Sequence, residues 1–326
     1  MDIVNWGIIG CGDVTEVKSG PAFNKVQHSK LVAVMRRSGP KAKDYAQRHG
    51  VPKWYDDANL LINDPEVNAI YIATPPSSHE EYTLSSLKAG KPVYVEKPMT
   101  MNAASARRMV NAASELNQKL VVAHYRRAQP FYTRIKELIE ANTIGKILLA
   151  RIECYKKPVT DKEMTDPGRA WRIDPSMAGG GLFHDLSPHQ LDMMLYLFGE
   201  IERATGIATT QGNSYKADDI VAGTILFRNK VLFEGVWCFN VPPEIEKESC
   251  EIIGTEGKIS FSFFEHKPIL MTRNGKTETI VIDPLQHVQQ PMIEKIVDYF
   301  RGKQSNPCSG ETGLKVMELI DSFTIS

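Results

Sequence analysis

The chain has no excess of charge of either sign, few cysteines and no long apolar run. Its 39 basic and 39 acidic side chains cancel over 326 residues. A nucleic-acid binder usually carries a basic stripe that displaces counterions, and no run of Lys and Arg here is long enough to make one. The sequence therefore excludes nucleic acid as a partner.

Cysteine is scarce and scattered. The count is odd and no two form a CxxC pair; the five are Cys11, Cys154, Cys238, Cys250 and Cys308. This arrangement favours buried free thiols over a disulfide framework or a zinc knuckle. No apolar run approaches the ~18 residues that a membrane-spanning helix needs, and the first residues lack the basic segment of a signal peptide. We expect a cytoplasmic protein with no membrane segment.

The length and composition predict two globular domains. The hydrophobic fraction of 42% and the charged fraction of 24% are ordinary for a soluble protein. Single cores tend to split beyond roughly 250 to 300 residues, and this chain is longer. A change of pattern places the boundary so that residues 1–123 form one domain and residues 124–326 the other.

The first 123 residues alternate short apolar runs with longer amphipathic stretches, which is typical of a parallel sheet with crossover helices. The predicted strands are Val4–Ile9, Leu31–Met35, Ala69–Ala73, Val93–Val95 and Leu120–Ala123. The predicted helices are Lys41–His49, Asp56–Ile62, His79–Ala89 and Ala103–Asn117. Such a doubly wound α/β sheet binds its ligand in a crevice at the strand ends.

After a helix predicted at Tyr132–Glu140 the pattern becomes rich in strands. These are Ile147–Tyr155, Ile201–Thr210, Ile220–Phe227, Lys230–Phe239, Glu248–Ile253, Lys258–Phe263, Ile269–Thr272 and Glu278–Ile282. Two helices, Pro291–Gly302 and Gly310–Phe323, follow them. We expect an α+β domain with a large, mostly antiparallel sheet. So few helices leave one face of that sheet uncovered, and we expect this face to join the subunits of a homodimer or homotetramer.

A glycine turn directly follows the first predicted strand. Gly10 suits the tight turn, and the missing side chain of Gly12 lets a phosphate approach the backbone. Asp13 and Val14 open the next helix, whose free N–H groups face such an anion. Thr15 stands where the fingerprint has its third glycine. The pattern predicts a dinucleotide site, and a plain glycine-rich turn is the alternative.

The end of the second strand indicates which dinucleotide binds. An NAD site usually places Asp or Glu there for the ribose 2′-OH, about 20 residues past the glycines. Here the strand ends in Arg36, Arg37 and Ser38, two guanidiniums and a hydroxyl that suit a 2′-phosphate. We predict that NADP(H) is preferred and NAD(H) is possible. The alternative is a pair of solvated surface arginines.

Two further strand ends are expected at the same crevice. Thr74, Pro75 and His79 follow the third of these strands, where the prolines stop pairing and shape a wall beside the cofactor. Glu96 and Lys97 follow the next strand, and a partly desolvated Lys can titrate low enough to move a proton. An ordinary surface Glu–Lys pair is the alternative.

Three motifs together resemble the Gfo/Idh/MocA oxidoreductases over nearly the whole chain. They are the glycine turn Gly10-Cys11-Gly12, the tripeptide Glu96-Lys97-Pro98, and a GGG-x3-D-x3-H segment that starts at Gly179. The resemblance implies a Rossmann domain for a nicotinamide cofactor and an α/β domain with a large open sheet. Members mostly oxidise or reduce a secondary alcohol or carbonyl on a sugar, cyclitol or related ring. It also implies that Lys97, Asp185 and His189 are the catalytic group.

The chemistry of these residues suits proton exchange with an alcohol or carbonyl. Asp185 and His189 are four apart and so share a helix face. Pro188 fits only the first turn of a helix, which puts Asp185 or Ser187 at the cap. We expect His189 to be the general acid/base, Lys97 to donate to the same oxygen, and Asp185 to orient the substrate hydroxyls or the imidazole. Lys97 and His189 could exchange the proton role.

A metal cluster is the competing interpretation of the segment around Asp185. The nearby His184, His189 and Asp192 are suitable ligand types. However, the two histidines are five apart and point to different faces of a helix, and no other His or Cys lies at a ligand spacing. We therefore expect no metal ion.

Aromatic and basic residues in two short segments are candidates for the substrate pocket. Tyr125 and Arg126 follow the last strand of the first domain, and Trp171 and Arg172 precede the triple glycine. Together with His184 they are predicted to contact a polyhydroxylated substrate. Packing between the domains is the alternative, because Arg and aromatic residues serve interfaces as well.

These observations predict an NADP(H)-dependent oxidoreductase of sugars, cyclitols or related polyols. Two alternatives stay open: a glycosidase of the same family that keeps its nicotinamide tightly bound, and a non-catalytic regulator that senses NADP. The regulator needs no proton-transfer group, so the joint presence of Lys97, Asp185 and His189 argues against it.

Overall fold

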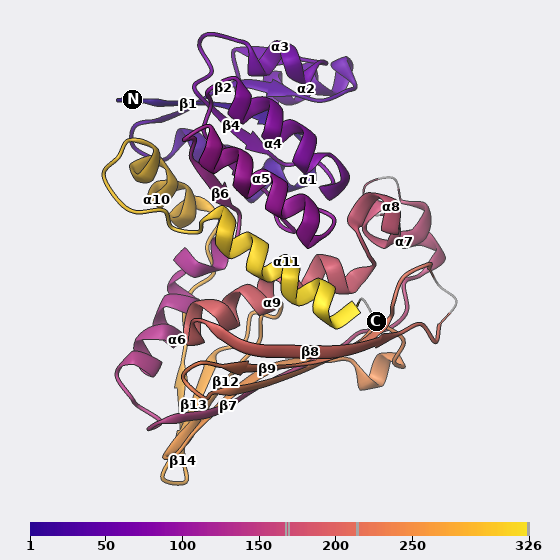
Figure 1. Ribbon diagram of the computed structural model, residues 1–326, viewed down its shortest axis with the longest axis vertical. Helices are drawn as coiled ribbons and strands as arrows, with labels where there is room; N and C mark the ends of the chain where they lie inside the picture. Colours follow the sequence, from indigo (N-terminus) through magenta and orange to yellow (C-terminus); the bar gives the residue numbers. More distant parts are fainter. Residues whose placement is uncertain (167, 169, 213–214, 325–326) are drawn as a thin grey trace. The chain divides into compact units, whose positions relative to one another are not determined.

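The computed structural model describes residues 1–166, 168, 170–212 and 215–324 and divides into two compact units (Figure 1). The first unit joins Met1–Gln129 to Leu285–Met317, and the second joins Pro130–Pro284 to the residues from Glu318 on. The sequence placed one boundary between residues 123 and 124, whereas the chain changes unit three times. The predicted and observed boundaries differ because the apolar face of a helix does not indicate which of the two sheets the helix will cover.

The first unit holds a six-stranded parallel sheet, which confirms the doubly wound α/β prediction. Its strands are β1 (Val4–Ile9), β2 (Ser29–Met35), β3 (Lys53–Tyr55), β4 (Ala69–Ile72), β5 (Val93–Val95) and β6 (Leu120–Val122). Their order is β3-β2-β1-β4-β5-β6, and every pair is parallel. The order reverses between β1 and β4, where a doubly wound sheet opens its ligand crevice. The short edge strand β3 was not predicted.

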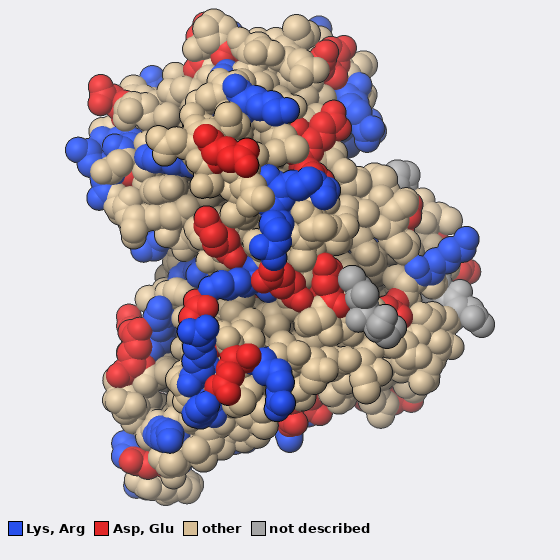
Figure 2. All heavy atoms as spheres, viewed as in Figure 1, with Lys and Arg blue, Asp and Glu red and all other residues tan. Residues whose placement is uncertain are grey.

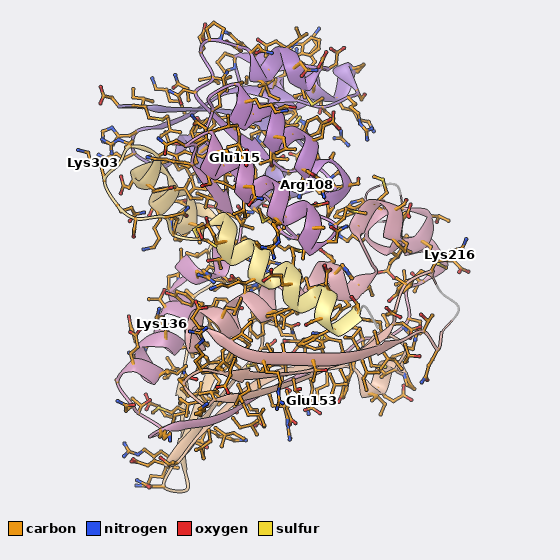
Figure 3. The ribbon with its side chains drawn as sticks, in the orientation of Figure 1. Arg108, Glu115, Lys136, Glu153, Lys216 and Lys303 are labelled. Carbon is orange, nitrogen blue, oxygen red and sulfur yellow. The ribbon has the colours of Figure 1, made fainter. Side chains whose placement is uncertain are left out.

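Helices cover this sheet, and an aromatic cluster fills one side of it. They are α1 (Asp13–Val17), η1 (Gly20–Asn24), α2 (Gly39–His49), α3 (Ala58–Ile62), η2 (Pro76–Ser78), α4 (His79–Lys88), α5 (Ala103–Glu115), η3 (Tyr125–Ala128), α10 (Gln290–Phe300) and the start of α11 (Gly310–Thr324). Arg108 of α5, labelled in Figure 3, pairs with Glu80 of α4. Phe300 of α10 packs on Trp6 of β1 with ring centroids 5.5 Å apart. This contact holds the returning segment on the first sheet.

The second unit holds an eight-stranded sheet in the order β14-β13-β12-β11-β7-β10-β9-β8. Its strands are β7 (Ile147–Tyr155), β8 (Ile201–Thr209), β9 (Ile220–Phe227), β10 (Leu232–Cys238), β11 (Lys247–Gly254), β12 (Gly257–Phe261), β13 (Ile269–Arg273) and β14 (Lys276–Ile280). All neighbours are antiparallel except β7 and β10. The predicted strands and the mostly antiparallel sheet are confirmed.

Helices lie along one face of this sheet (Figure 1). The helical segments of the unit are α6 (Pro130–Glu140), α7 (Asp161–Thr165), η4 (Ala170–Ile173), α8 (Pro175–Ala178), α9 (Leu182–Phe198), η5 (Pro243–Ile245) and the end of α11. Lys136 of α6 lies 3.9 Å from the ring centroid of Tyr196 on α9. Phe323 lies so close to the sheet that a Cβ on Gly223 would come within 2.3 Å of its ring. The glycine is therefore required for the helix to pack.

The other face of the sheet carries alternating charged and aliphatic side chains. Glu153 projects from the side opposite the helices in Figure 3 and pairs with Lys247 of the next strand. On the face drawn in Figure 2, basic and acidic side chains are interspersed over both units. In the part of the chain that the structure describes, no helix is long and apolar enough to cross a bilayer.

Candidate active site

The glycine turn after β1 brings three strand ends together. Gly10 has a φ of +95°, and a Cβ there would lie 2.7 Å from Thr74 Cγ2 at the end of β4. The N–H groups of Gly10 and Cys11 donate to Met35 O at the end of β2, at 2.9 and 3.2 Å. Only glycine combines this backbone conformation with so close an approach. The turn therefore sits at the switch point of the sheet order.

Gly12 has a different reason to lack a side chain. Apart from its chain neighbours, the one described group within 4 Å of a Cβ on Gly12 is Gly10 O, at 4.0 Å, so packing there does not require glycine. The first backbone bond of α1 runs from Thr15 N–H to Gly12 O, at 2.9 Å. Within the described residues the N–H groups of Gly12, Asp13 and Val14 make no hydrogen bond. Open space beside free N–H groups fits the phosphates of a dinucleotide.

Thr15 replaces the third glycine without loss of close packing. Its hydroxyl is buried and donates to Gly12 O at 2.8 Å, and its carbonyl accepts from the Tyr45 hydroxyl at 2.8 Å. The close approach is made instead at Gly20, where a Cβ would lie 2.1 Å from Thr15 O. The departure from the fingerprint is thus compensated five residues later.

The residues predicted to select the dinucleotide lie beside this turn. The half-buried Arg36 donates from Nη1 to Cys11 O at 3.3 Å, which ties its guanidinium to the turn. Arg37 is exposed, and Ser38 precedes α2 without making a side-chain cap bond. Burial raises the pKa of the Cys11 thiol to about 11, with Arg36 opposing the rise. The positive group of Arg36 therefore lies close to the expected phosphates.

His79 supports the neighbouring loops from inside the unit. Its ring is fully buried, with Nε2 2.7 Å from Thr74 O and Nδ1 3.1 Å from Pro98 O. Burial lowers its pKa. Thr74 accepts from the Ser78 hydroxyl at 2.8 Å, and Pro75 precedes η2. His79 thereby joins the ends of β4 and β5.

Glu96 lies beneath Lys97 in a buried network. One carboxylate oxygen accepts from the Tyr71 hydroxyl at 2.5 Å and from Gln289 Nε2 at 2.6 Å. The other accepts the Lys97 N–H at 3.2 Å. Gln289 in turn accepts from the Tyr94 hydroxyl at 2.7 Å. Burial and the charge of Glu96 raise the pKa of Tyr71 well above its usual range. No sequence pattern indicated this role for Tyr71, Tyr94 or Gln289.

Tyr125 and Arg126 lie in η3 of the first unit, not in the second as the predicted boundary implied. Tyr125 is buried, and the Arg126 guanidinium lies 5.8 Å from its ring centroid. The aromatic ring and the guanidinium therefore form one group after the end of β6.

The prediction that Pro188 lies in a first helical turn is wrong. Helix α9 begins at Leu182 after Gly181, and Pro188 lies inside it. The helix can start there because Gly181 has no side chain. A Cβ at this position would lie 2.4 Å from the ring of Tyr215. Pro188 lacks the N–H that would bond to His184 O, a loss that a helix interior normally resists. Burial of most of α9 on the sheet outweighs it.

Asp185 contacts the predicted substrate residue Arg172 within the second unit, and Arg172 in turn lies against Trp171. Its Oδ2 lies 3.4 Å from Arg172 Nε, and its side chain is 16% exposed. The Arg172 guanidinium lies 4.8 Å from the Trp171 ring centroid, and Trp171 donates from its indole to Gly168 O at 3.1 Å. The structure therefore assembles an aromatic, a cation and a carboxylate at the start of α9.

The two histidines of α9 have different surroundings. His184 is buried against Gly180, where a Cβ would lie 1.9 Å from its Nδ1, and burial lowers its pKa to about 4. His189 is 6% exposed, with its ring centroid 6.0 Å from that of Phe264. Among the described residues, no three His, Cys, Asp or Glu side chains are placed to hold a metal ion.

A second buried network anchors α9 and was not predicted. Gln190, next to His189, accepts from the Trp237 indole at 2.6 Å and donates to Glu248 at 3.3 Å. The other oxygen of Glu248 accepts from the Ser262 hydroxyl and from the N–H groups of residues 263 and 264, at 2.8 and 3.3 Å. The network thus fixes both α9 and the segment that carries Phe264. No motif could have revealed it, because its members are single residues in a helix, two strands and the segment after a third strand.

Two sequence models of known families match the chain. An oxidoreductase family with an NAD-binding Rossmann fold, GFO_IDH_MocA, matches residues 4–124. The GFO/IDH/MocA C-terminal domain matches residues 132–260. The two matches fall in the first and the second unit respectively.

Several proteins resemble this chain over most of its length. Oxidoreductase P35 of Formosa agariphila is 46% identical over 98% of either chain. Myo-inositol 2-dehydrogenase of Thermotoga maritima is 28% identical, over 94% of this chain and 91% of its own. A solved levoglucosan dehydrogenase complex with NADH and levoglucosan has a TM-score of 0.84 at 22% identity, covering 98% of this chain and 95% of that one. The last likeness concerns the fold.

Proposed function

The chain belongs to the Gfo/Idh/MocA oxidoreductase family, and we propose that it transfers hydride between NADP(H) and a secondary alcohol or carbonyl of a sugar, cyclitol or related polyol. It is an NAD(P)-dependent oxidoreductase of CH–OH groups, as its relatives are named. The preferred cofactor, the substrate class and the residue roles are the proposed part.

The observation that carries the proposal is the open space at Gly12. Among the described residues beyond its chain neighbours, only Gly10 O lies within 4 Å of a Cβ placed there, and the free N–H groups of Asp13 and Val14 adjoin it. A nicotinamide cofactor bound at this turn supplies the hydride acceptor or donor. The protein then has to bind the substrate, orient it and move one proton.

We assign proton transfer and the positioning of the substrate to three side chains. An imidazole can exchange a proton near neutral pH, so His189 takes the hydroxyl proton in oxidation and returns it in reduction. Lys97 donates a hydrogen bond to the same oxygen and stabilises its developing negative charge. Asp185 accepts hydrogen bonds from substrate hydroxyls, with Arg172 holding its carboxylate. Tyr125, Arg126 and Trp171 offer further polar and aromatic contacts, and the buried His184 supports the start of α9.

The open space at Gly12 can be tested directly. Gly12→Val places a side chain where the phosphate would lie, and its Cβ approaches Gly10 O no closer than 4.0 Å, so the fold should be kept. We expect NADPH binding, measured by fluorescence titration, to weaken by at least about tenfold, while the urea midpoint stays within error. Unchanged binding would contradict the cofactor site.

A spectrophotometric screen tests the reaction itself. NADPH oxidation and NADP⁺ reduction are followed against sugars, cyclitols, anhydrosugars and dihydrodiols, the classes that relatives' names suggest. Turnover with at least one class is expected. NADPH binding without turnover on any class would favour a regulator, and cofactor retained through gel filtration without net NADPH consumption would favour a glycosidase.

The preference for NADP(H) rests on Arg36. A guanidinium held at the glycine turn suits the 2′-phosphate, and no carboxylate follows β2 for a free ribose hydroxyl. Arg36→Asp should weaken NADPH binding by about tenfold or more and leave NADH binding similar or improved. Equal binding of both cofactors by the unaltered protein and by the variant would refute the preference.

We propose the uncovered sheet face as the homodimer or homotetramer contact. Ile207, Ala222 and Val236 stand in register across three strands there, and Ile207 is 77% exposed. Leu232 and Leu149 form a second aliphatic row nearby. Such rows suit a second copy of the same face.

Light scattering tests the proposed subunit contact. Val236→Lys combined with Leu232→Lys should reduce the mass at micromolar concentration to that of a monomer. The control Leu60→Lys alters an exposed leucine of α3 in the first unit and should leave the mass unchanged. A monomeric unaltered protein would remove the proposal.

A further inference from the structure

A cavity of about 380 Å³ opens inside the second unit, next to the start of α9. Its volume lies within the ~300–1,000 Å³ that small-molecule sites typically have. The lining comes from the chain after β7, from α7, η4 and α9, and from the residue before β11; it comprises Lys156–Val159, Glu163, Arg172, Ile173, Leu182 and Glu246. All of these residues belong to one unit, so the cavity does not depend on how the units are placed.

Three cations line the cavity, and two of them have no ionic partner. Lys156 and Lys157 both line the cavity because they follow the end of β7 at Tyr155. Within a strand, two consecutive side chains would point to opposite faces. Within the described residues neither ammonium group forms an ion pair or a side-chain hydrogen bond. The lining carries three cations and two carboxylates. Two adjacent lysines without a direct ion pair can therefore bind an anion that enters the cavity.

The two carboxylates of the lining are already engaged. Glu163 closes the capping box of α7: its Oε2 accepts from the Thr160 N–H and hydroxyl, at 3.1 and 2.8 Å. Glu246 accepts the backbone N–H of Lys157 at 3.2 Å. Among the described residues, no ion pair joins either carboxylate to Lys156 or Lys157.

Arg172 connects this cavity to the proposed catalytic residues. It lines the cavity and its Nε lies 3.4 Å from Asp185 Oδ2. A ligand whose hydroxyls reach Asp185 can thus extend another substituent past Arg172 toward the two lysines. The apolar side chains of Ile173 and Leu182 suit the C–H face of a sugar ring between these polar groups.

We propose that this cavity is an anion subsite that makes the enzyme prefer acidic sugars, whose carboxylate or phosphate binds Lys156 and Lys157. The proposal rests on the proposed function for its hydroxyl-bearing ligand, but the anion site itself does not require turnover. Carboxylate and phosphate share the required charge and acceptor oxygens, so the experiment includes both.

The test compares charged and neutral probes of one ring. The full-length protein is titrated calorimetrically with D-glucuronate, D-glucose 6-phosphate and D-glucose, and the same three are offered as substrates. The variant is Lys156→Gln combined with Lys157→Gln. The matched control is Lys162→Gln combined with Lys43→Gln, which likewise removes two positive charges, both exposed and neither in the cavity lining.

We expect at least one acidic probe to bind about tenfold more tightly than glucose, and this advantage to be lost in the double lysine variant but not in the control. Loss for glucuronate alone assigns a carboxylate, and loss for the phosphate alone assigns a phosphate ester. Acidic probes bound no better than glucose, or bound equally by the variant, overturn the subsite. Acidic probes bound through the lysines without turnover of any probe keep the subsite but count against the proposed function.

Discussion

Each unit buries one glutamate close to the proposed chemistry, and the two glutamates differ in the groups that satisfy them. Glu96 of the first unit accepts from the hydroxyl of Tyr71 and from Gln289, whose own acceptor is bonded to the hydroxyl of Tyr94. A hydroxyl can donate or accept by rotation. The two tyrosine hydroxyls of the first network can therefore turn from donors into acceptors if residue 96 is given a group that donates.

The corresponding network of the second unit has a fixed direction. Glu248 accepts from two backbone N–H groups, and Gln190 is oriented by the indole N–H of Trp237. N–H groups donate only, so no rotation can turn them into acceptors. The comparison teaches that the two networks differ at the glutamine beside the carboxylate: Gln289 is bonded to the hydroxyl of Tyr94, which can turn, and Gln190 to the indole N–H of Trp237, which cannot. Four predictions test this contrast.

The largest effect should come from the proposed catalytic groups that these networks hold. Lys97→Met and His189→Asn should each lower kcat by about 10²–10⁴-fold, because each removes a group that exchanges or stabilises the proton. NADPH affinity should change little. Steady-state kinetics across pH identifies the proton donor as the residue whose loss removes a limb of the profile.

Lys88→Met, on the exposed end of α4, is the control for the kinetic comparison. If the limb disappears only in His189→Asn, the rigid network carries the proton group; if only in Lys97→Met, the adaptable one does. Unchanged turnover in both variants would sink the catalytic assignment.

Removal of either buried carboxylate should be the next largest effect. Glu96→Ala and Glu248→Ala each leave several buried donors unsatisfied, so we expect losses of about 2–4 kcal/mol in the free energy of unfolding. Glu248→Ala should lose more, because its backbone donors cannot turn elsewhere. Urea unfolding of the two variants measures the difference. A larger loss at Glu96 would reverse the contrast.

The sequence predicted the framework of both units but neither network. Strand and helix periodicity is local, and so are the glycine turn and the Glu96-Lys97-Pro98 tripeptide, which is why these elements were found. Gln289 reaches Glu96 across 193 residues, and no local pattern reports such a contact. Gln190 and Glu248 are likewise single polar residues whose partners only the folded sheet defines.

Two other differences have the same physical origin. Helix α9 begins before Asp185 because Gly181 lies against Tyr215 and most of α9 is buried on the sheet, a tertiary effect that overrides the local preference of Pro188. Residues 285–317 return to the first unit because α10 packs on Trp6 through Phe300. In both cases the burial of an apolar face decided the outcome, and the sequence shows the face but not its partner.

The third prediction compares how protonation of one buried histidine in each unit, His184 and His79, changes the free energy of unfolding with pH. Burial lowers the pKa of His184 to about 4, below the ~6.5 of an unfolded histidine. As pH falls, His184 is therefore protonated in the unfolded chain before it is protonated in the folded protein. The free energy of unfolding is highest above about pH 6.5 and decreases toward pH 4. The slope should reach about 1.4 kcal/mol per pH unit.

His184→Gln should flatten this slope. The pKa of His79 is also lowered by burial, but the carbonyl oxygens of Thr74 and Pro98 oppose the shift. His79→Gln should therefore change the slope less. Urea titrations between pH 4 and 7 on both variants give the comparison, and equal slopes would show that the two environments do not differ.

The smallest and sharpest test replaces each buried glutamate by its amide. At position 96, a glutamine NH₂ can donate to the hydroxyl of Tyr71 once that hydroxyl turns toward Ser19, 3.1 Å away. Gln289 can also reverse its amide, so that its oxygen accepts from residue 96 and its NH₂ donates to the hydroxyl of Tyr94. At position 248, the new NH₂ faces Gln190, which cannot reverse without setting an NH₂ against the indole N–H of Trp237. We expect Glu96→Gln to lower the free energy of unfolding by less than about 0.5 kcal/mol and Glu248→Gln by about 1–2 kcal/mol, since only the second leaves a buried donor unsatisfied. Equal losses in urea unfolding would mean that the hydroxyl groups of the first network are no more adaptable than the N–H groups of the second.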